Sequence, residues 1–207
     1  MPKIARIAVA VSVFAVAFAG VGWLGLFVAE KAGLELRIPF LEPDPGGAFA
    51  LVDHNGQPFT EANLQGQPSL IYFGYTYCPD ICPTHLADLM TALDLMGDDG
   101  KAIRPIFVSI DPARDTVEQV AGYAAHFSER MVGLTGTPEQ VKTAAKAFGV
   151  YYRKVAAAGD DAYQMDHSAL GYLMAMDGGF LTTVPPGIPP QEMADKMRKF
   201  LNTPGGA

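Results

Sequence analysis

The chain has 207 residues, of which 49% are hydrophobic and 18% charged, and its formal net charge is −7 at pH 7. This length allows one domain with a sizeable core plus an appendage, and the apolar content excludes a generally disordered chain. The negative charge, together with the lack of any run rich in Lys and Arg, argues against nucleic acid as a partner.

The first segment is predicted to be a membrane anchor. Residues 7–29 carry no charged side chain. At 1.5 Å per residue they would span roughly 34 Å, enough for the hydrocarbon core of a bilayer. Lys3 and Arg6 precede this run, which puts the N-terminus in the cytoplasm under the positive-inside rule. A cleaved signal peptide is the alternative, because residues 17–19 (Ala-Phe-Ala) fit a cleavage site. The apolar run continues well past them, which favours an uncleaved anchor over residues 1–31.

The rest of the chain is expected to lie outside the cytoplasm. No transit-type sequence precedes the anchor, so we expect a bacterial inner membrane with the functional domain in the periplasm. Residues 32–47 are rich in Pro and Gly and are predicted to be a linker. The compact domain is expected over residues 48–203.

A β-hairpin is predicted at the start of this domain. Asn55-Gly56 lies between the apolar runs 49–53 and 57–60, which is typical of a tight hairpin turn. His54, beside the turn, is predicted to be an exposed turn residue.

The centre of the domain is predicted to alternate strands and helices. Residues 69–75 are a continuous apolar and aromatic run, which indicates a buried strand. Asp115 is expected to be the N-cap of a later helix, with Glu118 completing a capping box. The other elements expected from periodicity and turn residues are a helix at about 83–96, a strand at 103–110, a helix ending near 127, a strand at 131–135, a helix at about 137–149, a strand at 150–155, a hairpin of 169–176 with 180–184, and a helix at 190–201.

This order indicates an α/β fold with a central mixed sheet flanked by helices, because strands that alternate with helices pair largely in parallel. The chain closes on a β-hairpin and a helix, and its cysteines stand at the C-terminal end of an early central strand. Both features are typical of the thioredoxin-like fold.

The only two cysteines, Cys78 and Cys82, stand where the strand at 69–75 leads into a helix. Free backbone N–H groups and the helix dipole favour thiolates at such a position. Pro83 disfavours helical geometry at the residue before it, so Cys82 is expected at the edge of the helix. In an exported domain the default expectation is a Cys78–Cys82 disulfide. Closing so short a loop would stabilise a fold little, which leaves a redox-active or metal-binding pair as the other interpretation.

A metal site would need a third ligand, and the histidines are the candidates. His167 is expected in a polar loop that, in a thioredoxin-like fold, lies against the cysteine turn. His85 is the alternative ligand, or an exposed helix residue, and His126 is expected to be a structural residue at a helix C-terminus. Two thiolates with one imidazole suit copper. Zinc is the competitor, although a structural zinc site takes four protein ligands.

Three acidic residues could support such a site. Asp111 follows the strand at 103–110 and is either a helix-entry residue or a partner that orients the ligands. Asp80, between the cysteines, could tune the local charge or cap the helix. Asp166, directly before His167, is a candidate of the same kind as Asp111.

Three blocks of the sequence resemble the Sco/SenC family of copper chaperones. They are residues 72–84 (YFGYTYCPDICPT), 108–116 (VSIDPARDT) and 166–173 (DHSALGYL). The resemblance implies a thioredoxin-like periplasmic domain that binds one copper ion, as Cu(I) or Cu(II), through Cys78, Cys82 and His167. It also implies metallation of the binuclear copper site of cytochrome c oxidase subunit II, with an upstream periplasmic copper donor. His85 departs from the family pattern, because a residue unable to bind copper is expected there.

Several functions remain compatible with these residues. A metallochaperone, which is not an enzyme, is favoured. A thiol–disulfide oxidoreductase that keeps the copper-site cysteines of subunit II reduced would use the same two sulfurs. The stretch between Lys154 and Leu170 lacks the proline that thioredoxin-type enzymes place opposite their cysteines, and it contains His167 instead. A redox or copper sensor remains open. A thiol peroxidase is disfavoured, because Tyr75 stands where its threonine is required.

Overall fold

The computed structural model describes residues 44–156 and 163–203. The chain divides into two compact units, residues 1–43 and 44–207, and the described residues belong to the second. The predicted anchor at 7–29 and most of the predicted linker lie outside the described residues, so both stay predictions. Within the described part of the chain, no helix combines the length and the apolar character that crossing a membrane requires.

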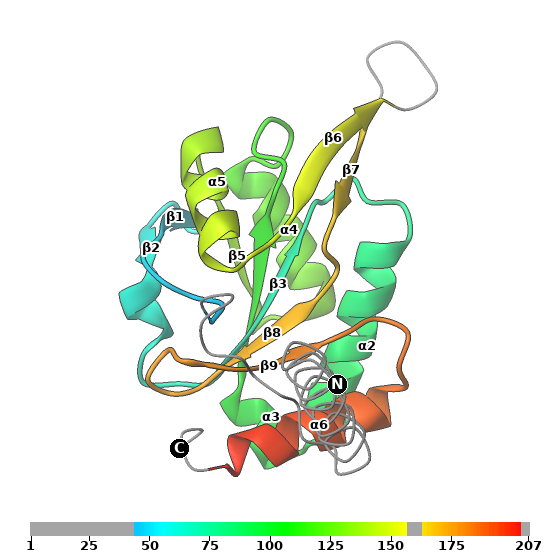
Figure 1. Ribbon diagram of the computed structural model, residues 1–207. Helices are drawn as coiled ribbons and strands as arrows, with labels where there is room; N and C mark the ends of the chain where they lie inside the picture. Colours follow the sequence, from blue (N-terminus) through cyan, green and yellow to red (C-terminus); the bar gives the residue numbers. More distant parts are fainter. Residues whose placement is uncertain (1–43, 157–162, 204–207) are drawn as a thin grey trace, which may run out of the picture. The chain divides into compact units, whose positions relative to one another are not determined.

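The described elements follow the predicted alternation of strands and helices (Figure 1). They are β1 (Ala50–Asp53), β2 (Pro58–Thr60), the 3-10 helix η1 (Glu61–Leu64), β3 (Ser69–Gly74), α2 (Ile81–Leu95), α3 (Asp98–Ala102), β4 (Arg104–Ser109), α4 (Val117–Phe127), β5 (Val132–Thr135), α5 (Pro138–Ala147), β6 (Tyr152–Ala156), β7 (Tyr163–His167), β8 (Gly171–Met174), β9 (Phe180–Val184) and α6 (Pro190–Leu201).

The main sheet has seven strands in the order β2-β1-β5-β4-β3-β8-β9. The three central strands, β5, β4 and β3, pair in parallel, with Phe73 opposite Val108 in the β3–β4 register. The remaining pairs, including the predicted hairpins β1–β2 and β8–β9, are antiparallel. The prediction of a central mixed sheet flanked by helices is therefore confirmed.

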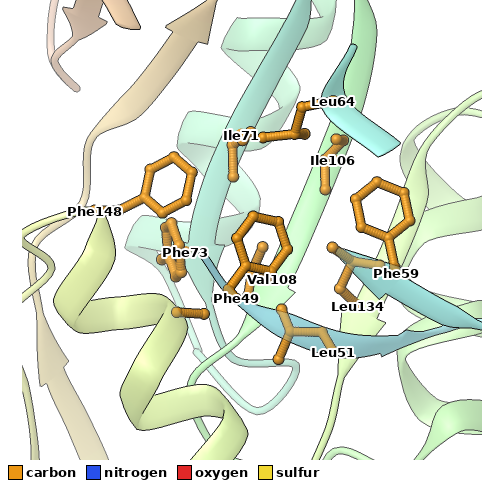
Figure 2. Close-up of a pocket in the computed structure, with 11 residues that line it drawn as sticks. Phe49, Leu51, Phe59, Leu64, Ile71, Phe73, Ile106, Val108, Leu134 and Phe148 are labelled. Carbon is orange, nitrogen blue, oxygen red and sulfur yellow. The ribbon is translucent and has the colours of Figure 1, made fainter. Parts of the chain in front are cut away.

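Side chains of the central strands alternate between two faces of this sheet. On one face, apolar residues from β1, β2, the central strands and the end of α5 enclose a pocket without any polar lining residue (Figure 2). Its lining residues are Phe49, Leu51, Phe59, Leu64, Ile71, Phe73, Ile106, Val108, Leu134, Ala144 and Phe148. A pocket of this composition is hydrophobic core and offers nothing to a metal ion.

The opposite face of the sheet packs against α2 and α4. Phe107 of β4 contacts Tyr123 of α4, with ring centroids 4.8 Å apart. On α2, Leu86, Leu89 and Leu93 are buried, and Met90 is partly buried against the core. This helix begins two residues earlier than predicted, at Ile81, so that Cys82 lies inside its first turn.

The start of α4 differs from the prediction. Its N-cap is Thr116, whose hydroxyl accepts the backbone N–H of Gln119. Asp115 instead turns inward and is buried. Its carboxylate accepts hydrogen bonds from the Ser109 hydroxyl and from both the backbone N–H and the hydroxyl of Thr76. Burial raises the pKa of this carboxyl, and these hydrogen bonds oppose the rise. The residue therefore joins β4 to the loop that carries the cysteines.

The histidine beside the first hairpin is not an exposed turn residue. His54 is half-buried, and its Nδ1 accepts the backbone N–H of Gly133 in β5 at 2.9 Å. The prediction was wrong because the hairpin folds back onto the edge of β5, where Val52 and Asp53 pair with it.

A second, two-stranded sheet was not predicted. β6 and β7 pair with each other in antiparallel fashion, with Tyr152 opposite His167, and neither is hydrogen-bonded to the main sheet. The hairpin projects from the end of the main sheet (Figure 1). Residues 163–167, predicted to be loop, are a strand, and His167 is its last residue.

Candidate metal centre

The two cysteines lie between the C-terminal end of β3 and the first turn of α2. Cys82 is fully buried and Cys78 is 9% exposed. The backbone N–H of Cys78 donates to the Tyr75 carbonyl at 3.2 Å. The backbone N–H of Cys82 donates to Cys78 Sγ at 3.4 Å. A backbone N–H in the first turn of the helix thus donates to a sulfur, and such a donor favours the thiolate form of the cysteine.

Gly74, the last residue of β3, makes room for this arrangement. A Cβ at this position would lie 3.2 Å from Cys82 Sγ and 2.9 Å from Cε1 of Tyr72. Both distances are tighter than ordinary van der Waals contact. The glycine therefore allows the sulfur of Cys82 to approach the strand directly.

His167 reaches the cysteines from the β6–β7 hairpin, 85 residues further along the chain. Its Nε2 lies 3.2 Å from Cys82 Sγ, and its Nδ1 lies 3.0 Å from the Ser168 carbonyl oxygen. A carbonyl can only accept a hydrogen bond, so in the neutral ring Nδ1 carries the proton. The lone pair of Nε2 then faces the sulfur, which is the tautomer and orientation of a metal-binding histidine.

The two thiols differ in acidity. The hydrogen bond from Cys82 and those from the backbone N–H groups of Asp80 and Cys82 hold the pKa of the Cys78 thiol below its ordinary value, although burial opposes this. The hydrogen bond to Cys78 and burial raise the pKa of the Cys82 thiol. We therefore assign the thiolate to Cys78, and Cys82 keeps its proton until a cation or a redox partner removes it. Both cysteines are free thiols in this structure.

Two tyrosines wall the site. The rings of Tyr72 and Tyr75 meet the imidazole of His167 edge-on, at centroid distances of 6.4 and 6.0 Å. Both tyrosines are buried, and burial, with the Cys82 thiol adding to it, raises the pKa of Tyr72. The two rings thus close the site toward the core, and His167 is partly exposed.

The three acidic candidates take different positions. Asp111 is buried, but its carboxylate accepts hydrogen bonds from Arg114 Nε at 2.5 Å and from the Tyr163 hydroxyl at 2.8 Å. Among the described residues, no hydrogen bond joins it to a cysteine or to His167. Asp80 is exposed and occupies the N-cap position of α2 without a side-chain cap hydrogen bond. Asp166 is exposed on the hairpin and pairs with Arg153 at 3.2 Å.

His85 is buried, so the prediction of an exposed helix residue is wrong. It is 1% exposed, and its ring meets Tyr72 edge-on at 5.3 Å. Within the described residues neither ring nitrogen has a hydrogen-bond partner of good geometry. Helical periodicity could have revealed this burial, because His85 shares the α2 face of Leu86 and Leu89. Burial lowers the pKa of this imidazole, although the Ala169 backbone opposes the shift.

The close approach of Cys78, Cys82 and His167 allows two kinds of chemistry. Two sulfurs and one imidazole can hold a soft metal ion, and a thiolate beside a second thiol can exchange with disulfides. Among the described residues, no three His, Cys, Asp or Glu side chains are arranged as a ready-made metal cage. Cys82 and His167 instead contact each other directly, and Cys78 Sγ accepts the backbone N–H of Cys82, so an entering cation would replace the contact between the sulfur and the imidazole.

Comparison with known proteins shows where this chain belongs. The SCO1/SenC family model matches residues 41–202. Protein SenC of Rhodobacter capsulatus is 40% identical over 163 residues, which are 77% of this chain and 73% of that protein. The chain spans from 41% to 75% of the length of the curated relatives that it matches.

Solved structures give the same result. ScoI of Bradyrhizobium japonicum, solved with copper bound, is 40% identical, with a TM-score of 0.68 over 75% of this chain and 99% of that one. BsSco, described as a member of the Sco family of cytochrome c oxidase assembly proteins, is 22% identical, with a TM-score of 0.58 over 78% of this chain and 95% of that one, a likeness of fold alone. The family match over residues 41–202 and the 40% identity to SenC show that this chain belongs to the SCO1/SenC family.

Proposed function

We propose that this protein is a copper metallochaperone that binds one copper ion through Cys78, Cys82 and His167 and delivers it during the assembly of cytochrome c oxidase. The observation that carries the proposal is the 3.2 Å approach of His167 Nε2 to Cys82 Sγ, with the second ring nitrogen tied to the Ser168 carbonyl. The relative from Bradyrhizobium, solved with copper bound, supports copper as the ion.

The donor set suits a cargo that must be both held and released. Thiolate sulfurs are soft and select Cu(I), and imidazole accepts either oxidation state. His167 is partly exposed and Cys78 is 9% exposed, whereas Cys82 is fully buried. A recipient's ligands can therefore replace Cys78 and His167 first and Cys82 last, so that the ion passes by stepwise ligand exchange without becoming free.

The finer parts of the proposal come from the sequence. Residues 7–29 anchor the chain in a bacterial inner membrane, and the domain works in the periplasm. The recipient is the binuclear copper centre of cytochrome c oxidase subunit II, and an upstream periplasmic protein supplies the ion. The SCO1/SenC family, to which this chain belongs, is described for BsSco as a family of cytochrome c oxidase assembly proteins, which supports the oxidase as the recipient, and the choice of subunit II comes from the sequence resemblance.

A second function is favoured by the unequal acidity of the thiols. Cys78, with a lowered pKa, is suited to attack a disulfide, and Cys82 beside it is suited to resolve the mixed disulfide. The products would be a Cys78–Cys82 disulfide and two thiols on the partner. In that case the protein is a thiol–disulfide oxidoreductase that keeps the recipient's copper-binding cysteines reduced.

The test compares copper stoichiometry and absorption of the reduced full-length protein with those of the His167→Ala variant. We expect one copper per chain in the wild type and a thiolate-to-Cu(II) absorption band that is lost in the variant. His126→Ala is the matched control, because His126 is exposed on α4, and it should leave both unchanged. If the wild type retains no copper but turns over a disulfide substrate, the oxidoreductase function replaces the chaperone function.

A further inference from the structure

The hairpin that carries His167 has few ties to the rest of the domain. Among the described strands, β6 and β7 pair only with each other, and no strand of the main sheet is hydrogen-bonded to either. The two strands are also exposed for much of their length. A two-stranded ribbon is marginally stable by itself. Contacts of its side chains with the domain must therefore decide where His167 stands relative to the cysteines.

Tyr152 and Met165 of the hairpin pack against the core, and Arg114, in the loop between β4 and α4, supplies the polar contacts. Its Nη1 donates to the Tyr163 carbonyl at 3.1 Å, and its Cζ lies 3.6 Å from the centroid of the Tyr163 ring, where β7 begins. Lys154 of β6 places its Nζ 3.5 Å from the same centroid. The Tyr163 ring is thus in cation–π contact with both an arginine of the domain and a lysine of the hairpin.

The same arginine also touches the cysteine turn. Its Cζ lies 4.9 Å from the ring centroid of Tyr77 and 5.7 Å from that of Tyr75, the residues on either side of Thr76 just before Cys78. Arg114 therefore contacts both the segment that supplies the sulfurs and the segment that supplies the imidazole.

Asp111 fixes the arginine and the tyrosine together. One carboxylate oxygen accepts Arg114 Nε, and the other accepts the Tyr163 hydroxyl. The Asp111 side chain is 5% exposed and that of Arg114 24% exposed, so this ion pair is screened less than a surface pair. The planar guanidinium can satisfy the carboxylate, the carbonyl and the ring at once, which a lysine ammonium cannot do.

We propose that Asp111, Arg114 and Tyr163 form a clamp that positions His167 against Cys82, and that this clamp sets how tightly the third ligand holds copper. The inference rests on the proposed copper site. The three are positioning residues, because their effect on the ion passes through His167.

The test is a double-mutant cycle on the reduced full-length protein, with Cu(I) affinity measured against a competing chelator. Arg114→Ala should weaken Cu(I) binding by on the order of 10- to 100-fold, as loss of an orienting partner does at other metal sites. In a His167→Ala background, where the two cysteines alone hold the ion, the same substitution should change the affinity by less than about twofold. An equal loss in both backgrounds would overturn the clamp.

Two further variants sharpen the result. Tyr163→Phe keeps the ring contacts and removes only the hydrogen bond to Asp111, so it should give a smaller loss that is again confined to proteins with His167. If Arg114→Ala does not fold, Tyr163→Phe takes its place in the double-mutant cycle.

Arg153→Ala is the matched control, because Arg153 lies on the same hairpin but pairs with the exposed Asp166. Its affinity should equal that of the wild type, and a loss as large as that of Arg114→Ala would contradict the clamp.

Amide hydrogen exchange without copper separates this proposal from the proposed function. In the metal-free protein, Arg114→Ala should accelerate amide exchange in β7 (Tyr163–His167) relative to β3. This measurement does not depend on which ion the site binds. If the wild type binds no copper but this acceleration is seen, the copper function fails and the clamp stands. If copper binds as expected and β7 exchange is unchanged in Arg114→Ala, the clamp fails and the copper function stands.

Discussion

Two histidines of this protein show how position decides the chemistry of one residue type. His167 is partly exposed, and a carbonyl holds its proton on Nδ1, so that Nε2 is free to bind a cation. His85 is 1% exposed and packs on Tyr72. Burial disfavours the imidazolium, because a charge loses its hydration inside the domain. The two residues therefore differ in function because of their surroundings, and His85 acts as part of the packing beneath the site.

His85 makes stability depend on pH. Burial lowers its pKa in the folded state below the ordinary value of 6.5, so between that value and the lower folded pKa the unfolded chain binds more protons. The contribution of neutral His85 to the free energy of unfolding is therefore complete above about pH 6.5. It falls as the pH drops through this window, by at most ~1.4 kcal/mol per pH unit for one proton. We expect His85→Leu to reduce the slope of unfolding free energy against pH between pH 7 and 5.

The control for this prediction is His126→Leu. His126 is exposed near the C-terminus of α4, so its replacement should leave the slope as in the wild type. Denaturant titrations at several pH values measure the slope in all three proteins. An unchanged slope in His85→Leu would show that another group causes the loss of stability in acid.

At the scale of elements, the packing of α4 on β5 depends on a bare backbone. A Cβ at Gly133 would lie 2.7 Å from the carbonyl oxygen of Val120 and 3.3 Å from the Ala124 Cβ. The first contact is with helix backbone, which cannot rotate away as a side chain can. α4 is thus close to the sheet because residue 133 has no side chain.

Gly133→Ala should therefore destabilise the domain by about 1–3 kcal/mol, because the helix must move outward or the strand must shift. Gly122→Ala is the matched control in the same pair of elements. Gly122 lies inside α4, and a Cβ there would have no neighbouring atom within 4 Å, so alanine should stabilise by roughly 0.5–1 kcal/mol through its helix propensity. Urea unfolding of both variants measures the change in the free energy of unfolding, which should be negative for Gly133→Ala and positive for Gly122→Ala. An unchanged free energy in Gly133→Ala would refute the tight contact.

At the scale of the whole molecule, cargo binding and folding are linked. The proposed third ligand, His167, lies on a hairpin 85 residues away from Cys82, so an ion bound to both would hold together two segments that only the folded chain brings close. An ion that binds the folded state alone stabilises it by about 2.7 kcal/mol at a concentration one hundred times Kd.

We therefore expect Cu(I) at about one hundred times its Kd to raise the Tm of the reduced protein by roughly 5–10 °C. This is the shift that about 2.7 kcal/mol of added unfolding free energy gives in domains of 150–250 residues. Cys82→Ser should abolish the rise, since it removes the buried sulfur that faces His167. Differential scanning calorimetry with and without copper measures the effect. A rise that persists in Cys82→Ser would place the stabilising ion elsewhere on the protein.

The sequence by itself determined the order of most elements and which side chains are the candidates for the chemistry. The alternation of predicted strands with predicted helices indicated the central mixed sheet, and Asn55-Gly56 indicated the first hairpin. Helix α6 was predicted with its observed limits. These features depend on local propensity and periodicity, which a sequence displays directly. The pairing of Cys78 and Cys82 with His167 was also predicted, from residue types and a family resemblance.

Only the tertiary structure decided what surrounds those groups. Asp115 was predicted to be a helix cap from its spacing to Glu118, but the fold places it against Ser109 and Thr76, where one buried and two partly buried donors need an acceptor. β7 was predicted to be loop because Gly159, Asp160 and Asp161 before it indicate a loop, although Tyr163 and Met165 alternate with Gln164 and Asp166 as in a half-buried strand. Its pairing with β6 is a contact between strands, which the sequence does not display. The contacts of Arg114 with Tyr77 and Tyr163 join three segments that are distant in sequence. No local pattern encodes such contacts, because their energy depends on which surfaces the packed core brings together.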